Sequence, residues 1–404
     1  MTSLIEFFRR NAPWLFAGFL LTFSSSFGQT FFIAIFAGEI RADFDLSNAA
    51  WGGVYAVATM ASAAVMVFAG GVTDRFRVRV IGPVILVGLA LATTLMSLST
   101  GLVTLTVAVF LLRLMGQGMM SQTAMVAMSR WFVATRGRAI SVAGLGVALG
   151  EALLPLAFVA LMGVFHWQTL WLVASVFLVI AALVIILILK AERTPQAMAR
   201  ESTAVGMFGR NWTRTEVLRH WLFWLTLPAI LGPAAWNTAF FFHQVHFAQA
   251  KGWAHFDLVA LFPIFTLTGV ASMLLTGWLV DRFGSAKLAG LYLFPVAIGY
   301  VLIGIADGLG LAAVALMFMG ISVGANSTMS AALWAEFYGT VHLGRIRAMT
   351  GAVMVLGSAI GPGLCGWLID QGIAMPQQAY GISVFFVFAA ILAAIGGRRA
   401  ARYL

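Results

Sequence analysis

A single arginine interrupts the middle of a long apolar stretch of the sequence, Val103 to Met128. Gln117 follows Arg113 by four residues, and residues four apart share a face of an α-helix. A stretch of about 20 apolar residues can cross a bilayer, where a central charge costs about 3 kcal/mol unless it faces protein or water. We therefore expect Arg113 to face a buried partner, a cavity or both.

One acidic residue also lies near the centre of an apolar stretch. Glu151 follows Gly144, Gly146 and Gly150, and glycines let neighbouring membrane helices approach closely. We expect that neighbour to be the helix of Arg113, which makes an Arg113 to Glu151 ion pair the sharpest hypothesis. If an anion took the arginine, the carboxylate would lose its counter-charge and would tend to bind a proton. The alternative is a static ion pair that fixes helix register.

The elements that must position these residues are membrane-spanning helices. Of the 404 residues, 61% are hydrophobic and 9% are charged, whereas about a quarter of the residues of soluble domains are charged. Apolar stretches of spanning length predict twelve helices. They cover residues 13–37, 49–71, 80–99, 103–128, 139–163, 169–190, 220–248, 258–280, 288–306, 311–337, 348–369 and 379–397.

The basic residues orient this arrangement. If both termini are cytoplasmic, all of the 24 Lys and Arg residues except Arg41, Arg113 and Lys251 lie on the cytoplasmic side, as the positive-inside rule requires. A polar segment divides six spans from six. The sequence therefore predicts an all-α membrane protein with two pseudo-symmetric six-helix bundles, residues 1–190 and 220–404, joined by a cytoplasmic linker, residues 191–219.

Two loop motifs recur in the second half of the sequence. The pattern GxxxDRF occurs at Gly70 to Phe76, after the second span, and again at Gly277 to Phe283, after the eighth. The loop Arg130 to Ala139, after the fourth span, has a counterpart in Glu336 to Ala348, after the tenth. Internal duplication of this kind is how many secondary transporters are built, with the substrate site near the middle of the membrane.

These motifs, the twelve spans and the long central loop resemble the major facilitator superfamily over essentially the whole chain. The resemblance implies transport by alternating access, with spans one, four, seven and ten around a central cavity. It also implies a cytoplasmic gate at the two GxxxDRF motifs, formed by Gly70, Asp74, Arg75, Gly277, Asp281 and Arg282. The segment from Trp334 to Asp370 looks most like bacterial monocarboxylate and oxalate/formate porters, although spans eight and eleven lack the interior cation expected there.

Polar residues occur at helical spacing on the four spans that this resemblance places around the cavity. We expect them to form a substrate site in which Arg113 binds an anion and four amide side chains orient it: Gln117, Gln29, Asn237 and Asn326. The alternative is that such amides only hold helices together, which is common in membranes.

The leading hypothesis for function is a multi-pass transporter of the bacterial inner membrane that moves a small, monocarboxylate-like anion together with protons, with Glu151 as the proton carrier. The alternatives are a proton-coupled exporter of amphipathic drugs, whose pocket the 19 methionines could line, and a non-transporting sensor or scaffold. The sequence has no nucleotide fold, phosphate-binding loop or metal-ligand cluster. We expect no enzymatic activity, cofactor, metal, nucleic acid or obligate protein partner, and lipid as the surroundings.

Overall fold

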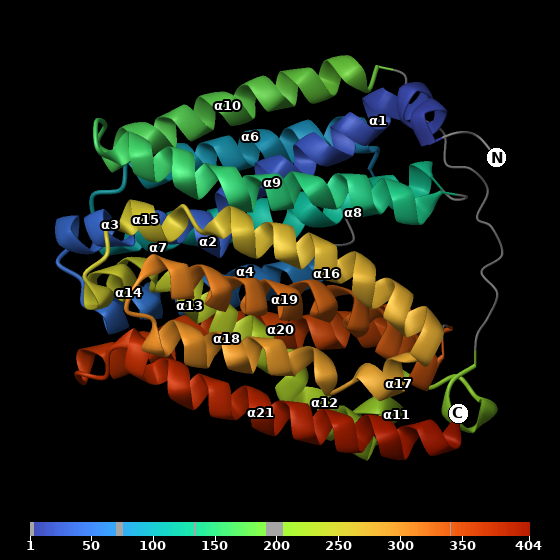
Figure 1. Ribbon diagram of the computed structural model, residues 1–404. Coiled ribbons are helices and arrows are strands. Elements are labelled where there is room, and N and C mark those ends of the chain that lie inside the picture. The colour runs from blue at the N-terminus through green and yellow to red at the C-terminus, as the bar shows by residue number, and fades with distance from the viewer. Residues whose placement is uncertain (1–3, 70–75, 133–134, 191–204, 340) are drawn as a thin grey trace. The chain divides into compact units, whose positions relative to one another are not determined.

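The computed structural model describes residues 4–69, 76–132, 135–190, 205–339 and 341–404, and every regular element in these ranges is a helix (Figure 1). Eleven helices are long and apolar enough to cross a membrane. This count covers the described residues, and a pair of helices, Arg9–Gly28 and Thr30–Asp43, brings it to twelve when the two, bent by 48° at the break between them, are taken as one span. The predicted all-α, multi-pass architecture is confirmed.

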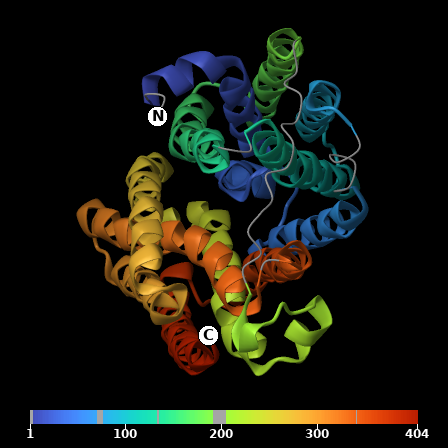
Figure 2. The ribbon, with the colours of Figure 1, turned by 90° about the vertical axis from the view of Figure 1, so that its right-hand side faces the viewer.

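The chain forms two compact units, and unit 1 comprises Met1–Leu46 and Gly53–Glu201. Its spans appear end-on in the view of Figure 2. The helices of unit 1 are α1 (Leu4–Ser25), η1 (Ser26–Gly28), α2 (Thr30–Ile33), η2 (Ala34–Phe36), α3 (Ala37–Asp43), most of α4 (Asn48–Ala69), α6 (Val78–Ser97), α7 (Leu102–Leu112), η3 (Arg113–Met120), α8 (Ser121–Trp131), α9 (Arg136–Met162) and α10 (Trp167–Ile188).

Unit 2 comprises Ser47–Gly52 and Ser202–Leu404, so the described part of the predicted linker belongs to it. The helices of its first half are η4 (Met207–Gly209), α11 (Arg214–Arg219), α12 (Trp221–Gly232), η5 (Pro233–Asn237), α13 (Thr238–Phe242), α14 (Gln244–Lys251), α15 (His255–Val259) and α16 (Phe262–Phe283). The remainder are α17 (Ser285–Leu288), η6 (Leu291–Leu293), α18 (Phe294–Ile305), α19 (Leu309–Tyr338), α20 (Leu343–Asp370), α21 (Met375–Ala400) and η7 (Ala401–Tyr403).

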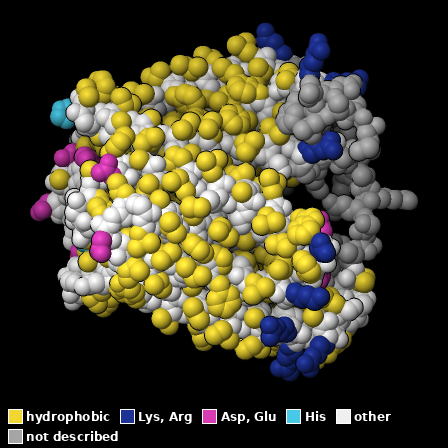
Figure 3. All heavy atoms as spheres, viewed as in Figure 1, with side chains coloured by type: hydrophobic (Ala, Val, Ile, Leu, Met, Phe, Trp, Pro, Cys, Tyr) yellow, Lys and Arg dark blue, Asp and Glu magenta, His cyan; other side chains and the backbone are white. Residues whose placement is uncertain are grey.

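The surface of each unit is that of a membrane protein. Hydrophobic side chains cover the length of the helices in Figure 3, while Lys and Arg side chains gather at one end of each unit. Large apolar side chains such as Leu91, Leu183 and Leu267 are exposed, which suits contact with lipid tails because no water is present in the core of a bilayer.

The first turn of α4 is capped by a carboxylate from the end of α20, within unit 2. Asp370 accepts hydrogen bonds from the backbone N–H groups of Asn48, at 3.1 Å, and Ala49, at 2.9 Å. A negative charge at a helix N-terminus satisfies free N–H groups and opposes the positive end of the helix dipole. One turn further along α4, the Trp51 ring stacks on Phe242, with ring centroids 5.5 Å apart. These contacts attach the start of α4 to unit 2.

Two spans change from α-helix to π-helix at positions that the sequence had singled out. η3 begins at Arg113, and η5 contains both Pro233 and Asn237. Proline has no N–H to continue the α-helical ladder, which accounts for η5. In η3 the chain is pressed against span one, because a Cβ atom on Gly116 would lie 2.6 Å from the Cα atom of Gly28. Short π-helical segments are frequent at functional sites.

The glycines of α9 pack on α1. A Cβ atom on Gly146 would lie 2.3 Å from the carbonyl oxygen of Phe19, and one on Gly150 would lie 2.1 Å from the hydroxyl of Ser26. The predicted close approach is therefore found at Gly146 and Gly150, with span one as the neighbour, but not at Gly144, where a Cβ atom would have no neighbour within 4 Å. At Gly146 and Gly150 α9 therefore meets span one, while it also packs on α8, the second half of the span that carries Arg113.

Candidate functional site

Arg113 lies at the start of η3 in unit 1 and is only 1% exposed. Its Nη1 atom donates to the carbonyl oxygen of Gly28 and to the hydroxyl of Thr30, both at 3.3 Å. Its Cζ atom lies 5.2 Å from the centre of the Tyr55 ring, a distance at which a cation and an aromatic face attract each other. The hydroxyls of Thr30 and Tyr55 are hydrogen-bonded to each other. Nε and Nη2 of Arg113 are buried and have no hydrogen-bond partner among the described residues.

The predicted ion pair between Arg113 and Glu151 is absent from the contacts of the described residues. The partners of the guanidinium come from the break in span one and from α4. Glu151 is half-buried on α9 and has contacts of its own. The physical reason is the packing of the glycine face of α9, which places Gly150 against Ser26 of span one. The prediction of a buried partner for Arg113 holds, but that partner is neutral.

The four predicted amide residues are all half-buried. Gln29 lies between Gly28 and Thr30, the two residues that accept hydrogen bonds from Arg113, and Gln117 lies one turn beyond Arg113 on η3. In unit 2 the Asn237 Oδ1 atom accepts a hydrogen bond from the Tyr300 hydroxyl at 3.3 Å. Asn326 lies on α19 and lines a pocket. The structure thus places Gln29 and Gln117 near Arg113 in unit 1 and Asn326 at a pocket in unit 2, whereas Asn237 is not among the residues that line that pocket.

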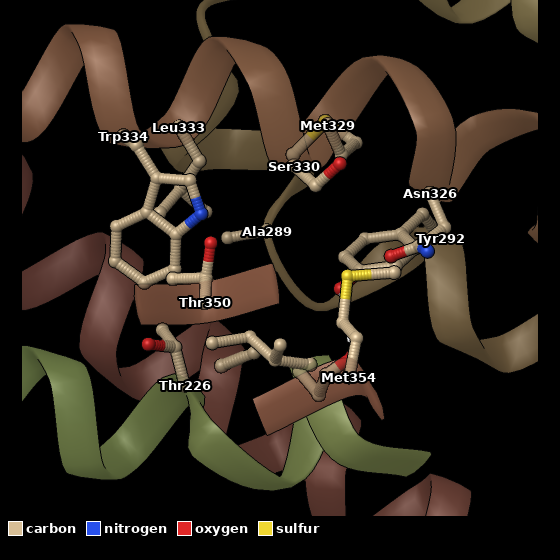
Figure 4. Close-up of a pocket in the computed structure, with 13 residues that line it drawn as sticks. Thr226, Ala289, Tyr292, Asn326, Met329, Ser330, Leu333, Trp334, Thr350 and Met354 are labelled. Carbon is tan, nitrogen blue, oxygen red and sulfur yellow. Dashed lines mark hydrogen bonds between the residues drawn. The ribbon is translucent and has the colours of Figure 1, made fainter. Parts of the chain in front are cut away.

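The pocket lies within unit 2, among α12, the segment from Ala289 to η6, α19, α20 and α21 (Figure 4). The residues that line it are Thr226, Ala229, Ile230, Ala289, Tyr292, Asn326, Met329, Ser330, Leu333, Trp334, Thr350, Met354 and Ala393. None carries a formal charge. The cavity volume is about 30 Å³, room for about two waters, so a larger ligand requires side chains or helices to move.

The lining combines apolar bodies with a few polar groups. In Figure 4 the Trp334 indole and the Thr350 hydroxyl lie on one side of the pocket, and the Asn326 amide lies beside Tyr292 and Met354 on the other. Sequence reasoning identified Asn326 but missed Trp334 and the two methionines. The missed signal on α19 is helical periodicity, because residues 326, 329, 330, 333 and 334 recur at the spacing of one helix face.

Residues 205–220, here called the cap segment, pack on the end of α19 next to this pocket. The backbone N–H of Trp212 donates to the carbonyl oxygen of Tyr338 at 3.0 Å. The His220 Nδ1 atom lies 3.1 Å from the Tyr338 hydroxyl. A Cβ atom on Gly206 would lie 2.4 Å from the carbonyl oxygen of Phe337, so only glycine fits there. The Tyr338 ring stacks on Trp334, with centroids 5.8 Å apart. The cap segment therefore supports one wall of the pocket.

We predict that the stability of unit 2 falls at mildly acidic pH through His220. Burial, together with the nearby positive charge of Arg210, lowers the pKa of His220 below its usual value of about 6.5. The folded state therefore favours the neutral ring, so stability is full above pH of about 6.5 and declines as the pH falls below it. Thermal unfolding in detergent between pH 8 and 5 should show a larger fall in Tm for the wild type than for His220→Gln. Equal falls would contradict this assignment.

The predicted gate is described only in its second copy. Gly70, Asp74 and Arg75 lie outside the described residues. Gly277 is half-buried on α16, whereas Asp281 and Arg282 are exposed at the end of that helix. The carboxylate that meets a helix start here is Glu336, whose Oε2 atom accepts the backbone N–H of Ser285 at 2.8 Å. Among the described residues, no group of three or more His, Cys, Asp or Glu could hold a metal ion.

Comparison with known proteins places these features in a family. Residues 18–362 match the Major Facilitator Superfamily. The chain is 32% identical over 130 residues to a protein named multidrug resistance protein B homolog from Mycobacterium tuberculosis. That alignment covers 31% of this chain and 24% of the relative, so it spans about a quarter of the length of the relative.

Solved structures of low sequence identity share the fold. A bacterial homolog of the human lysosomal transporter Spinster, in an inward-facing and unoccupied conformation, superimposes with a TM-score of 0.73 at 16% identity and covers 97% of both chains. The nucleoside transporter NupG superimposes with a TM-score of 0.72 at 11% identity, covering 96% of this chain and 99% of that chain. With its multi-pass helical architecture and the family match over most of its length, the chain belongs to the Major Facilitator Superfamily of membrane transporters.

Proposed function

We propose that this chain is a secondary transporter of the bacterial inner membrane that moves small amphipathic organic molecules by alternating access. The observation that carries the proposal is the uncharged pocket of unit 2. Aromatic and aliphatic side chains with a few polar groups are typical of small-molecule sites. Met329 and Met354 add flexible contacts that can adapt to ligands of different shape. A pocket of this kind favours an aromatic or aliphatic body over a compact anion.

The sequence comparison supports the same substrate class. The relative from Mycobacterium tuberculosis is named for multidrug resistance, and this favours export of amphipathic molecules over the monocarboxylate that the sequence motifs had suggested. Protons are the proposed coupling ion, with Arg113 and Glu151 as the groups in unit 1 that serve the proton step. The proposed orientation has both termini in the cytoplasm, with the GxxxDRF motifs acting as the gate on that side.

A second candidate is proton-coupled transport of a small organic anion, and one observation favours it. Arg113 is a buried positive charge whose hydrogen-bond partners are both neutral. An unpaired charge inside a membrane span is costly and usually functional, and an anionic substrate would neutralise it. In this case Gln117 and Gln29 would orient the anion, and Glu151 would take up a proton.

The experiment that tests the proposal is uptake by purified protein in liposomes, with and without a pH gradient. The panel contains an uncharged aromatic dye, a lipophilic cation and short monocarboxylates. Uptake of the amphipathic compounds supports the pocket of unit 2 as the substrate site. Uptake confined to the carboxylates would replace the first candidate by the second.

A further inference from the structure

Only one nitrogen of the Arg113 guanidinium makes hydrogen bonds to the described residues, and the edge formed by the other two, here called the open edge, makes none. Nη1 makes both of the hydrogen bonds, to Gly28 and Thr30. Within the part of the chain that the structure describes, Nε and Nη2 are the two nitrogens of Arg113 without a hydrogen-bond partner. These two nitrogens lie on the same edge of the guanidinium plane, and one N–H of each points in the same direction. The open edge is therefore a pair of parallel donors.

Parallel donors of this kind match one class of ligand. A carboxylate presents two oxygens that accept two parallel N–H bonds at once, the arrangement that makes arginine and carboxylate a strong and specific pair. A halide ion can occupy the same region, but it offers a single centre and gains no such fork. A lysine in the same place would supply a point charge without the two parallel donors.

The surroundings of the open edge also suit a negative group. The guanidinium plane is held by the Tyr55 ring and by the two hydrogen bonds of Nη1, so the fork is pre-oriented. Thr59 lies one helical turn along α4 from Tyr55, and its hydroxyl is likewise buried without a hydrogen-bond partner. Burial of all these groups removes competition from water.

We propose that the Nε and Nη2 edge of Arg113 is a binding site for one carboxylate group. This inference deepens the second candidate function and is independent of the pocket in unit 2. Two sources can supply the carboxylate. One is a small monocarboxylate from solution, and the other is the side chain of Glu151, in the same unit, after a movement of α9 relative to span one.

The test is a calorimetric titration of the purified protein in detergent with sodium acetate, at constant ionic strength. Sodium chloride serves as the competing anion without a fork. The variants are Arg113→Lys, which keeps the charge but loses the fork, and Glu151→Gln, which removes the internal carboxylate. Arg214→Lys, an exposed residue of α11, is the matched control, and the Tm of each variant reports whether it is folded.

If a carboxylate from solution binds at the fork, the wild type should bind acetate saturably. The affinity for acetate should be at least about tenfold weaker in Arg113→Lys and unchanged in Arg214→Lys. Glu151 as the source predicts that acetate binds only after Glu151→Gln, and that Arg113→Lys in that background removes the binding. Absence of acetate binding from both the wild type and Glu151→Gln overturns the proposal, as does equal binding in Arg113→Lys. If the protein bound acetate but did not transport it, the binding site at Arg113 would be retained and only the second candidate function, anion transport, would be rejected.

Discussion

Replacing Trp334 by alanine should weaken the binding of an amphipathic ligand by at least about tenfold, because buried aromatic side chains dominate binding energies. Trp334 is 2% exposed, stacks on Tyr338 and forms one wall of the pocket in unit 2. Its indole is the largest side chain among the lining residues. The measurement is the Kd of an uncharged aromatic dye, obtained by fluorescence titration of the purified protein.

The matched control for this prediction is Trp367→Ala. Trp367 lies on α20, is 53% exposed and does not line the pocket, so its loss should leave the Kd unchanged. Trp334→Phe retains an aromatic wall and should recover most of the affinity. If Trp334→Ala bound the dye as tightly as the wild type while remaining folded, the pocket of unit 2 would have to be abandoned as the substrate site.

Replacing Arg113 by leucine should abolish accumulation driven by a pH gradient without lowering stability. The charge costs about 3 kcal/mol inside a span, and its two neutral hydrogen bonds, with Gly28 and Thr30, return about 1 kcal/mol each. The Tm should therefore be equal to or slightly above that of the wild type. Uptake against a gradient should fall by at least about 100-fold, the size of effect expected when a residue essential to one step is lost.

Arg214→Leu is the control, because Arg214 is an exposed arginine of α11 and substitutions of exposed residues usually change stability by less than about 0.5 kcal/mol. Tm and uptake are measured on the same preparations. Two results would count against the functional assignment of Arg113. One is full pH-driven accumulation in Arg113→Leu, and the other is a large fall in Tm, which would indicate a structural role.

The span map was the part of the fold that the sequence could predict. A bilayer demands that each crossing helix be long, apolar and internally hydrogen-bonded, so composition alone locates the helices. That Arg113 turns towards protein was also predictable, because a charge in the middle of an apolar span is costly when it faces lipid. Close helix contacts at Gly146 and Gly150 followed from the missing side chains. In each case the prediction rests on a property of the residue itself.

The partners of these residues could not be predicted in the same way. A glycine face shows that something approaches closely but does not identify the helix, and α9 meets span one where the helix of Arg113 was expected. The π-helix that begins at Arg113 contains the close contact of Gly116 with Gly28, a residue of another span, and no local pattern indicated that contact. The position of the cap segment was likewise not predictable, because Trp212 is held by a hydrogen bond to Tyr338, which is distant in the sequence. Tertiary packing decided all three.

The measurement that tests the proposed function most directly is the liposome uptake panel, run in parallel with wild-type protein and Trp334→Ala. The account predicts that wild-type protein takes up the uncharged dye or the lipophilic cation faster when a pH gradient is imposed, and that Trp334→Ala removes most of this uptake. Uptake of short monocarboxylates alone, unaffected by Trp334→Ala, would contradict the account and assign transport to an anion.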